Sequence, residues 1–290
     1  MWFWFALLSA VTSAISVTLN KKALAKVNAS LVSWTLFAFS LPFLIYPSLK
    51  DGIPKLNAYF WLATLGSVIC FGYAKTLALK SLKGSLMSEV VPLAFFSVLF
   101  QYVLGLIFFA EEIRLIPILG LILIVIGGYV LKVEEAKEGF LKPFQILVTN
   151  KNAFMYLGAM IIMTVSSVMD KTALNNMEPL NQSFYLLLGN IFITVVIGFY
   201  MSKNDFKWIG TVKSNFWVLF GSALAYTIVS LAYLYGITTG GALALVSGVK
   251  KLEVFFVLVI GLLLFGDKPK RGVWIGSLIM LAGVFLIKLG

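Results

Sequence analysis

Long apolar runs recur along the whole chain, and they leave one kind of fold open to it. The first run, "MWFWFALLSAVTSAISVTLN", is long enough to cross the hydrocarbon core of a bilayer as a helix, which takes about 20 residues. Of the 290 residues, 60% are hydrophobic and 12% are charged, whereas soluble domains average about 45–50% and 25%. The sequence therefore predicts an all-α integral membrane protein. The first run is interpreted as a retained span, because no basic residues precede it.

Hydropathy places ten membrane-spanning helices along the chain. The expected spans are residues 2–20, 30–48, 57–79, 85–110, 114–131, 152–170, 181–201, 215–236, 241–266 and 272–288. The connection at residues 133–151 is longer than the others and carries charges, a glycine and a proline. We therefore expect a five-helix repeat at 1–132, a linker at 133–151 and a second five-helix repeat at 152–290.

An internal repeat supports this division. A shift of 156 residues lays residues 84–132 over 240–288 without a gap, and "LNKKAL" at the end of the first span matches "MDKTAL" at the end of the sixth. The glycines that coincide include Gly120 with Gly276 and Gly127 with Gly283. Because each half has an odd number of spans, the halves enter the membrane in opposite directions, as in transporters with inverted repeats. These glycines also allow close helix contact, either within the bundle or between the protomers of a homodimer.

The composition removes several kinds of chemistry. The chain has no histidine and a single cysteine, Cys70, which excludes Ser-His and Cys-His nucleophiles and a zinc site built from Cys and His. No Asp-x-x-Asp pair, Walker loop or nucleotide-binding fingerprint is present. We therefore expect no enzyme, no cofactor and no metal site. The net charge of +11 is explained by topology and anionic lipid, so nucleic-acid binding is not needed to explain it.

Several motifs occur together in the repeat: a small residue that opens the fourth helix, Pro92 inside it, an acid that closes it, and a Gly-x6-Gly in the last helix. With the five-plus-five spans, they resemble the EamA-type branch of the drug/metabolite transporter superfamily. "LNKKAL" and "GVKKLEVFF" are similar to stretches of sugar-phosphate and nucleotide-sugar transporters. The resemblance implies that such paired bases hold a phosphate. Glu253 departs from that pattern, because it offers Lys250 a partner within the protein.

Three lysines lie inside predicted spans: Lys75, Lys250 and Lys251. A lysine at the centre of a membrane helix costs roughly 2.5–3.5 kcal/mol on insertion, so these side chains are expected to face polar groups. Lys250 and Glu253 are three residues apart on one helical face and are expected to pair, whereas Lys251 points about 100° away. Two interpretations remain open: a structural ion-pair network, or a water-filled cavity where Lys251 or Lys250 meets an anionic or zwitterionic substrate.

Two further features belong to the equivalent helices of the two halves. Gly248 falls on Pro92 under the 156-residue shift, which predicts a weak point, or hinge, at the same depth in both halves. Glu89 lies one turn before Pro92, and we expect it either to carry a proton or to pair with Lys75 or Lys80.

Candidate cavity residues also come from other spans. Tyr73, Tyr226 and Tyr233 lie on the third and eighth spans, where the resemblance implies cavity walls. The first span ends in Asn20 and Lys21, and the sixth ends in Asp170 and Lys171. These residues are interpreted either as anchors at the membrane interface or as site residues.

The distribution of basic residues predicts the orientation. The odd-numbered connections carry 15 Lys and Arg residues, and the termini and even-numbered connections carry five. The positive-inside rule then places both termini outside. The resemblance implies the opposite orientation, so the two predictions conflict.

The sequence thus predicts a multi-pass protein of the cell membrane. Its expected function is that of a secondary transporter, an exporter or exchanger, which moves a small polar or anionic metabolite by alternating access, with a proton or a counter-substrate as coupling partner. One alternative is an antiporter of phosphorylated sugars or other organic anions. Another, from a different class, is a membrane channel or scaffold without alternating access.

Overall fold

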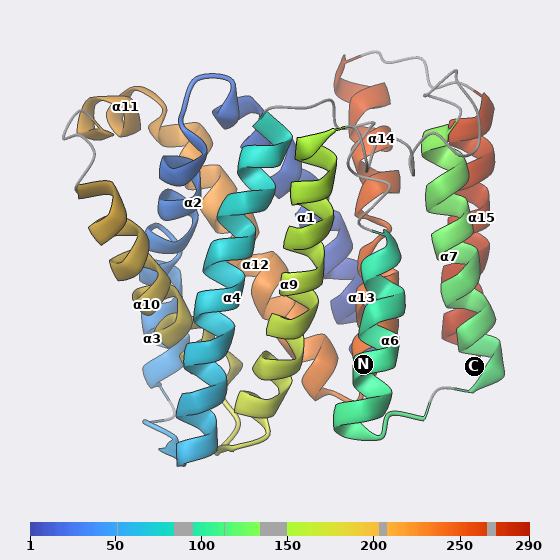
Figure 1. The fold of residues 1–290 in the computed structure, drawn as a ribbon, viewed down its shortest axis with the longest axis horizontal. Coiled ribbons are helices and arrows are strands. Elements are labelled where there is room, and N and C mark those ends of the chain that lie inside the picture. The colour runs from blue at the N-terminus through green and yellow to red at the C-terminus, as the bar shows by residue number, and fades with distance from the viewer. Residues whose placement is uncertain (51, 84–94, 113, 134–149, 203–207, 266–270) are drawn as a thin grey trace.

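The chain forms a bundle of long helices (Figure 1). The structure is a computed structural model, and it describes residues 1–290 apart from 51, 84–94, 113, 134–149, 203–207 and 266–270. The helices are α1 (Trp2–Leu24), α2 (Ala29–Ala38), α3 (Leu41–Leu49), α4 (Ala58–Lys83), α6 (Phe96–Phe109), α7 (Leu115–Val133), α9 (Lys151–Leu174), α10 (Gln182–Ser202), α11 (Trp208–Ser214), α12 (Phe216–Thr238), α13 (Leu243–Lys250), α14 (Glu253–Phe265) and α15 (Arg271–Leu289). Within the described residues, the strands are β1 (Lys55–Leu56) and β2 (Met177–Glu178), paired antiparallel.

Most of the expected spans coincide with these helices, and the differences are local. The span expected at 30–48 is divided into α2 and α3, and the span expected at 241–266 is divided into α13 and α14. The span expected at 85–110 is described from Phe96 onward, as α6. Over the described residues, six helical segments are each long and apolar enough to cross a membrane.

Local sequence explains where helices begin and where the second span breaks. The side chain of Asn28 accepts a hydrogen bond from the backbone N–H of Ser30 at the start of α2, as expected of an N-cap residue. The same span stops after Ala38 and resumes with a proline, Pro42, in the first turn of α3. Proline has no N–H to continue the hydrogen-bond ladder of the preceding turn, so it is tolerated at a helix start and breaks a helix interior.

Apolar side chains cover much of the surface and polar side chains lie inside, the reverse of the arrangement in a soluble protein. Large apolar side chains are exposed on most helices, including Trp4, Leu62, Ile107, Val195 and Leu263. Polar side chains are buried between helices, including Ser9, Thr64, Asn190 and Ser222. A soluble protein would not expose so much apolar surface, whereas lipid accepts it and polar groups then turn inward. The chain is therefore a multi-pass membrane protein.

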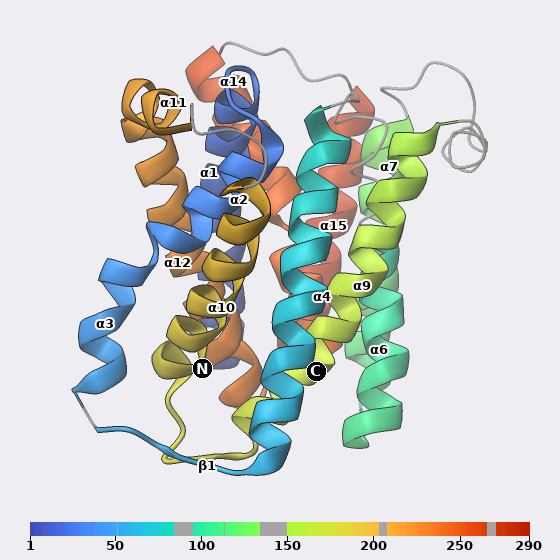
Figure 2. The ribbon, with the colours of Figure 1, turned by 60° about the vertical axis from the view of Figure 1, so that its left-hand side comes forward.

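Helices of the first half pack most extensively against helices of the second half. The closest pairs are α7 with α15, α4 with α9, and α1 with α12. In Figure 1, α7 and α15 form one end of the molecule, and α2, α3 and α10 form the other. Figure 2 shows both termini toward the same end of the bundle, in agreement with Figure 1.

Glycines bring the backbones of α7 and α15 into direct contact. A Cβ atom added at Gly120 would lie 2.5 Å from the carbonyl oxygen of Gly283, and one at Gly127 would lie 2.6 Å from that of Gly276. The expected role of these glycines in close helix contact is confirmed, and the contact is within the chain.

We predict that Gly127→Ala destabilises the protein by about 1–3 kcal/mol, because the methyl group forces the two helices apart. Thermal unfolding of the purified protein in detergent measures the effect. Gly158→Ala is the matched control, since nothing lies within 4 Å of its added Cβ. A Tm for Gly127→Ala as high as that of the control would contradict the close contact.

Candidate binding cavity

A central cavity of about 210 Å³ lies among helices of both halves. Polar side chains that line it include Ser13, Ser67, Lys75, Gln101, Asp170 and Asn190. A side cavity of about 170 Å³ adjoins it, because both are lined by Ser13, Lys75, Lys250 and Lys251. The side cavity extends past Asn20 to Lys21, at the end of α1.

The break between α13 and α14 places charges at the cavity. Lys250 lies in the last turn of α13, Lys251 and Leu252 form the turn, and Glu253 begins α14. A cation is stabilised at the C-terminal end of a helix and an anion at the N-terminal end, so the order of charges in "KKLE" suits a break here. Gly248 lies within α13, where an added Cβ would be 2.6 Å from Leu121, so the expected weak point falls three residues after it.

The break also separates two residues that the sequence predicts to be a pair. Lys250 and Glu253 belong to different helices and do not share a helical face. Within the described residues, the only ion pair with an N–O distance of 4.0 Å or less joins Lys171 to Glu111. The expected pair of Lys250 with Glu253 is therefore not formed. Instead, Glu253 accepts a hydrogen bond from the hydroxyl of Ser13.

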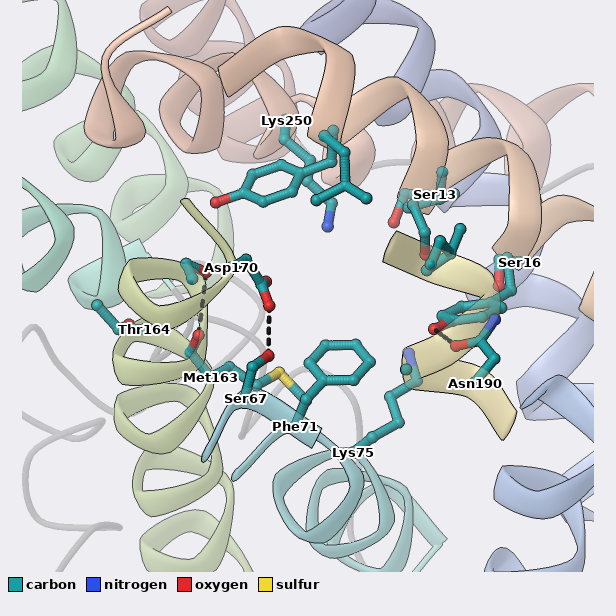
Figure 3. A pocket seen from close by; sticks show the side chains of 18 of the residues that line it. Ser13, Ser16, Ser67, Phe71, Lys75, Met163, Thr164, Asp170, Asn190 and Lys250 are labelled. Carbon is teal, nitrogen blue, oxygen red and sulfur yellow. Dashed lines mark hydrogen bonds between the residues drawn. The ribbon is translucent and has the colours of Figure 1, made fainter. Parts of the chain in front are cut away.

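The cavity lysines contact aromatic rings. Lys75 Nζ lies 5.9 Å from the ring centre of Tyr226, and Lys250 Nζ lies 5.2 Å from that of Tyr233. Such contacts provide roughly 0.5–2 kcal/mol against an insertion cost of roughly 2.5–3.5 kcal/mol, so they compensate for burial of each ammonium group only in part. Glu253 lines the side cavity with the same lysines, at more than 4.0 Å from their ammonium groups. Figure 3 shows the side chains of Lys75 and Lys250 extending into the same space. The arrangement therefore favours a bound anionic group.

Asp170 lines the central cavity from α9. Its Oδ1 accepts hydrogen bonds from the hydroxyls of Ser67 and of Tyr185, the latter at 2.6 Å. Figure 3 shows Asp170 and Lys250 on the walls of one space. The sequence left Asp170 open as an anchor at the membrane interface or a site residue, and the structure places it in the cavity wall. The match of "MDKTAL" with "LNKKAL" places Asp170 at the end of the sixth span, but it does not predict the direction in which the side chain points.

The other predicted site residues are divided between the cavity and the outside. Tyr226 and Tyr233 are buried and line the central cavity. Tyr73 is 63% exposed and lines neither cavity described above, so its predicted site role is not supported: its position on α4 turns it outward. Glu89 and Pro92 lie outside the described residues.

Lys171 lies next to Asp170 but points elsewhere. Its Nζ is 2.5 Å from Glu111 Oε1, and the two side chains are 16% and 9% exposed. The Glu111 carboxylate also accepts the backbone N–H of Leu243, at 3.0 Å for Oε2, in the first turn of α13. Glu111 therefore joins the end of the fourth span to α9 and to the N-terminal end of α13, where an anion is stabilised.

With this geometry in place, comparison with known proteins identifies the family. The pattern of the EamA-like transporter family matches residues 1–132 and 150–289. The chain belongs to the EamA-like transporter family. This family is part of the drug/metabolite transporter superfamily, and its members are membrane transporters.

Solved structures share the fold of this chain. One crystal structure, described only as that of a protein, matches with a TM-score of 0.75 over 99% of this chain and 95% of its own, at 14% identity. At that identity the likeness shows the fold alone. No curated protein sequence matches this EamA-like chain.

We predict that Glu111→Gln lowers the stability of this EamA-like protein by about 3 kcal/mol, because it leaves the charge of Lys171 buried without its partner. The Tm of the purified protein in detergent measures the loss. Glu112→Gln removes the same charge from an exposed neighbour and serves as the matched control. Equal Tm values for the two variants would show that the ion pair contributes nothing to stability.

Proposed function

We propose that this chain is a secondary transporter of the cell membrane that moves a small polar metabolite with an anionic group by alternating access. The observation that carries the proposal is a cavity between the two halves, lined by Lys75, Lys250 and Lys251. None of these lysines lies within 4.0 Å of a carboxylate oxygen of the described residues. A substrate anion would supply the missing partner while it is bound.

The pattern of helix packing supports two inverted five-helix halves. In the order of spans, α1 and α4 are the first and third, and α9 and α12 are the sixth and eighth. Exchanging the halves turns the contact of α1 with α12 into that of α9 with α4, and both are among the closest in the bundle. The glycine contacts of α7 with α15 exchange in the same way. Such a twofold relation is what inverted repeats produce, and the two stretches that match the family divide the chain at the same place.

Contacts at one end of the bundle support alternating access. Here β1 of the first half pairs with β2 of the second, and Asn57 donates to Asn176 at 2.8 Å. The ion pair of Glu111 with Lys171 joins the halves as well. The strand pairing and the Asn57–Asn176 hydrogen bond are small polar contacts that a rocking motion of the halves could break and remake, so they suit a gate better than a permanent seal.

Two alternatives to this proposal differ from it in the substrate or in the kinetics of transport. The lysines suit a phosphorylated sugar or another organic anion in exchange, as the resemblance of "GVKKLEVFF" to stretches of sugar-phosphate transporters implies. A channel or scaffold would use the same charged cavity without alternating access.

Counterflow in proteoliposomes, with a panel of amino acids, nucleosides and phosphorylated sugars, tests the proposal. We expect saturable counterflow of at least one compound, reduced about tenfold or more by Lys250→Ala and by Lys251→Ala, since a hydrogen bond to a charged group contributes roughly 1.5–3 kcal/mol. Lys213→Ala, which removes an exposed lysine in α11 away from both cavities, is expected to leave the flux unchanged.

Gel filtration establishes that each variant is folded before its flux is compared. Flux that does not saturate and shows no counterflow would replace the transporter with a channel. Normal counterflow in both cavity variants would remove the lysines from the substrate site.

A further inference from the structure

We propose that the central cavity binds a zwitterion, with the ammonium group of the substrate at Asp170 and its anionic group at Lys75, Lys250 and Lys251. This rests on the proposed transport function, because it names the class of substrate that the same cavity takes. The argument depends on two sets of polar groups on the cavity walls, one rich in acceptors and one rich in donors.

The acceptor-rich set contains the carboxylate of Asp170, and only one of its two oxygens accepts hydrogen bonds from the described residues. Both hydrogen bonds recorded for Asp170 within the described chain reach Oδ1, from Ser67 and Tyr185. No described side chain donates to Oδ2, and no described cation lies within 4.0 Å of either oxygen. A buried carboxylate is expensive without a cation or a full set of donors. Asp170 therefore has room for one charged donor from the cavity.

Gln101, on α6, brings a second acceptor to the same cavity. Gln101 is 6% exposed, and its Nε2 donates to Ser167 Oγ at 3.3 Å. Ser167 and Asp170 are three residues apart on α9 and so share a helical face. The Oε1 of Gln101 is buried and has no hydrogen-bond partner among the described residues. An ammonium group donates three hydrogen bonds, so it can serve a carboxylate and an amide oxygen together.

The donor-rich set comes from different helices. Lys75 belongs to α4, Lys250 ends α13, and Lys251 lies in the turn after it. Figure 3 shows Asp170 on one wall of the space, with Lys75 and Lys250 reaching into it from other sides. An ammonium is a compact point charge with three donors, which suits either a carboxylate or a phosphate oxygen.

The combination of the two sets narrows the substrate class. A simple anion would satisfy the lysines and leave Asp170 and Gln101 without a donor. A simple cation would satisfy Asp170 and add to the repulsion among three lysines. A molecule with an ammonium group and an anionic group, such as an amino acid or a phosphorylated amine, satisfies both sets at once. Sites that hydrogen-bond a substrate group strongly reject analogues that lack it.

Binding to the purified protein in detergent tests this inference without any measurement of flux. The probes are L-amino acids, each paired with the 2-hydroxy acid that lacks only its amine, together with phosphoethanolamine and glucose 6-phosphate. Calorimetry and the shift in Tm report binding. We expect at least one zwitterion to bind about tenfold or more tightly than its amine-free analogue.

Variants assign the two ends of the molecule. Asp170→Asn is expected to weaken zwitterion binding about tenfold or more and to leave the 2-hydroxy acid unaffected. Glu112→Gln, which removes an exposed carboxylate that lines neither cavity, is the control and is expected to bind normally. If Asp170→Asn does not fold, Gln101→Met removes the unpaired oxygen at little cost to the fold, and it should weaken zwitterion binding about fivefold.

Several results would contradict a zwitterion-binding cavity. Equal or tighter binding of hydroxy acids or glucose 6-phosphate, no binding of any zwitterion, or unchanged zwitterion binding in Asp170→Asn would overturn the inference. Unchanged binding with a lost response of flux to a pH gradient would instead make Asp170 a proton carrier, and would also overturn it. Zwitterion binding without counterflow would leave this inference standing and refute the proposed transport function.

Discussion

Charge inside an apolar bundle is the constraint on which the rest of this structure depends. A lysine that faced lipid near the middle of a span would cost several kcal/mol, so Lys75, Lys250 and Lys251 have to face the interior. That requirement orients α4 and the α13–α14 break toward one space. The aromatic rings of Tyr226 and Tyr233 stabilise two of these lysines in part and leave them available to a ligand.

The twofold pattern of packing makes such a space possible. The closest contacts of α1 and α4 are with α12 and α9, so helices of one half pack against helices of the other around the cavity. At the far end, α7 and α15 approach through glycines until their backbones touch. The contact of α7 with α15 is between backbones, whereas the cavity walls carry the long polar side chains. Small residues at one helix interface and large polar residues at another thus divide the bundle into a tightly packed part and a hollow part.

Much of this architecture was predictable, because lipid imposes a length and a polarity that a sequence must display. The six long apolar helices of the described residues follow from that rule, and the glycine contacts of α7 with α15 follow from the internal repeat. The direction in which an individual side chain points cannot be predicted from that rule. Tyr73 lies on a predicted span but turns outward. The pair of Lys250 with Glu253 was expected from the regular spacing of one helix, and it failed because the helix breaks between them. Asp170 enters the cavity only through packing of α9 against α4.

Asp170 and Lys171 are neighbours in sequence, but their side chains point to different parts of the structure. Asp170 faces the cavity, while Lys171 holds Glu111, which in turn binds the first turn of α13. The last turn of α13 carries Lys250 back to the cavity wall. A helix of eight residues is stiff, so a movement of its first turn must also move Lys250. The contact that joins the halves at one end and the cation that faces the cavity are therefore carried by the two ends of one short helix.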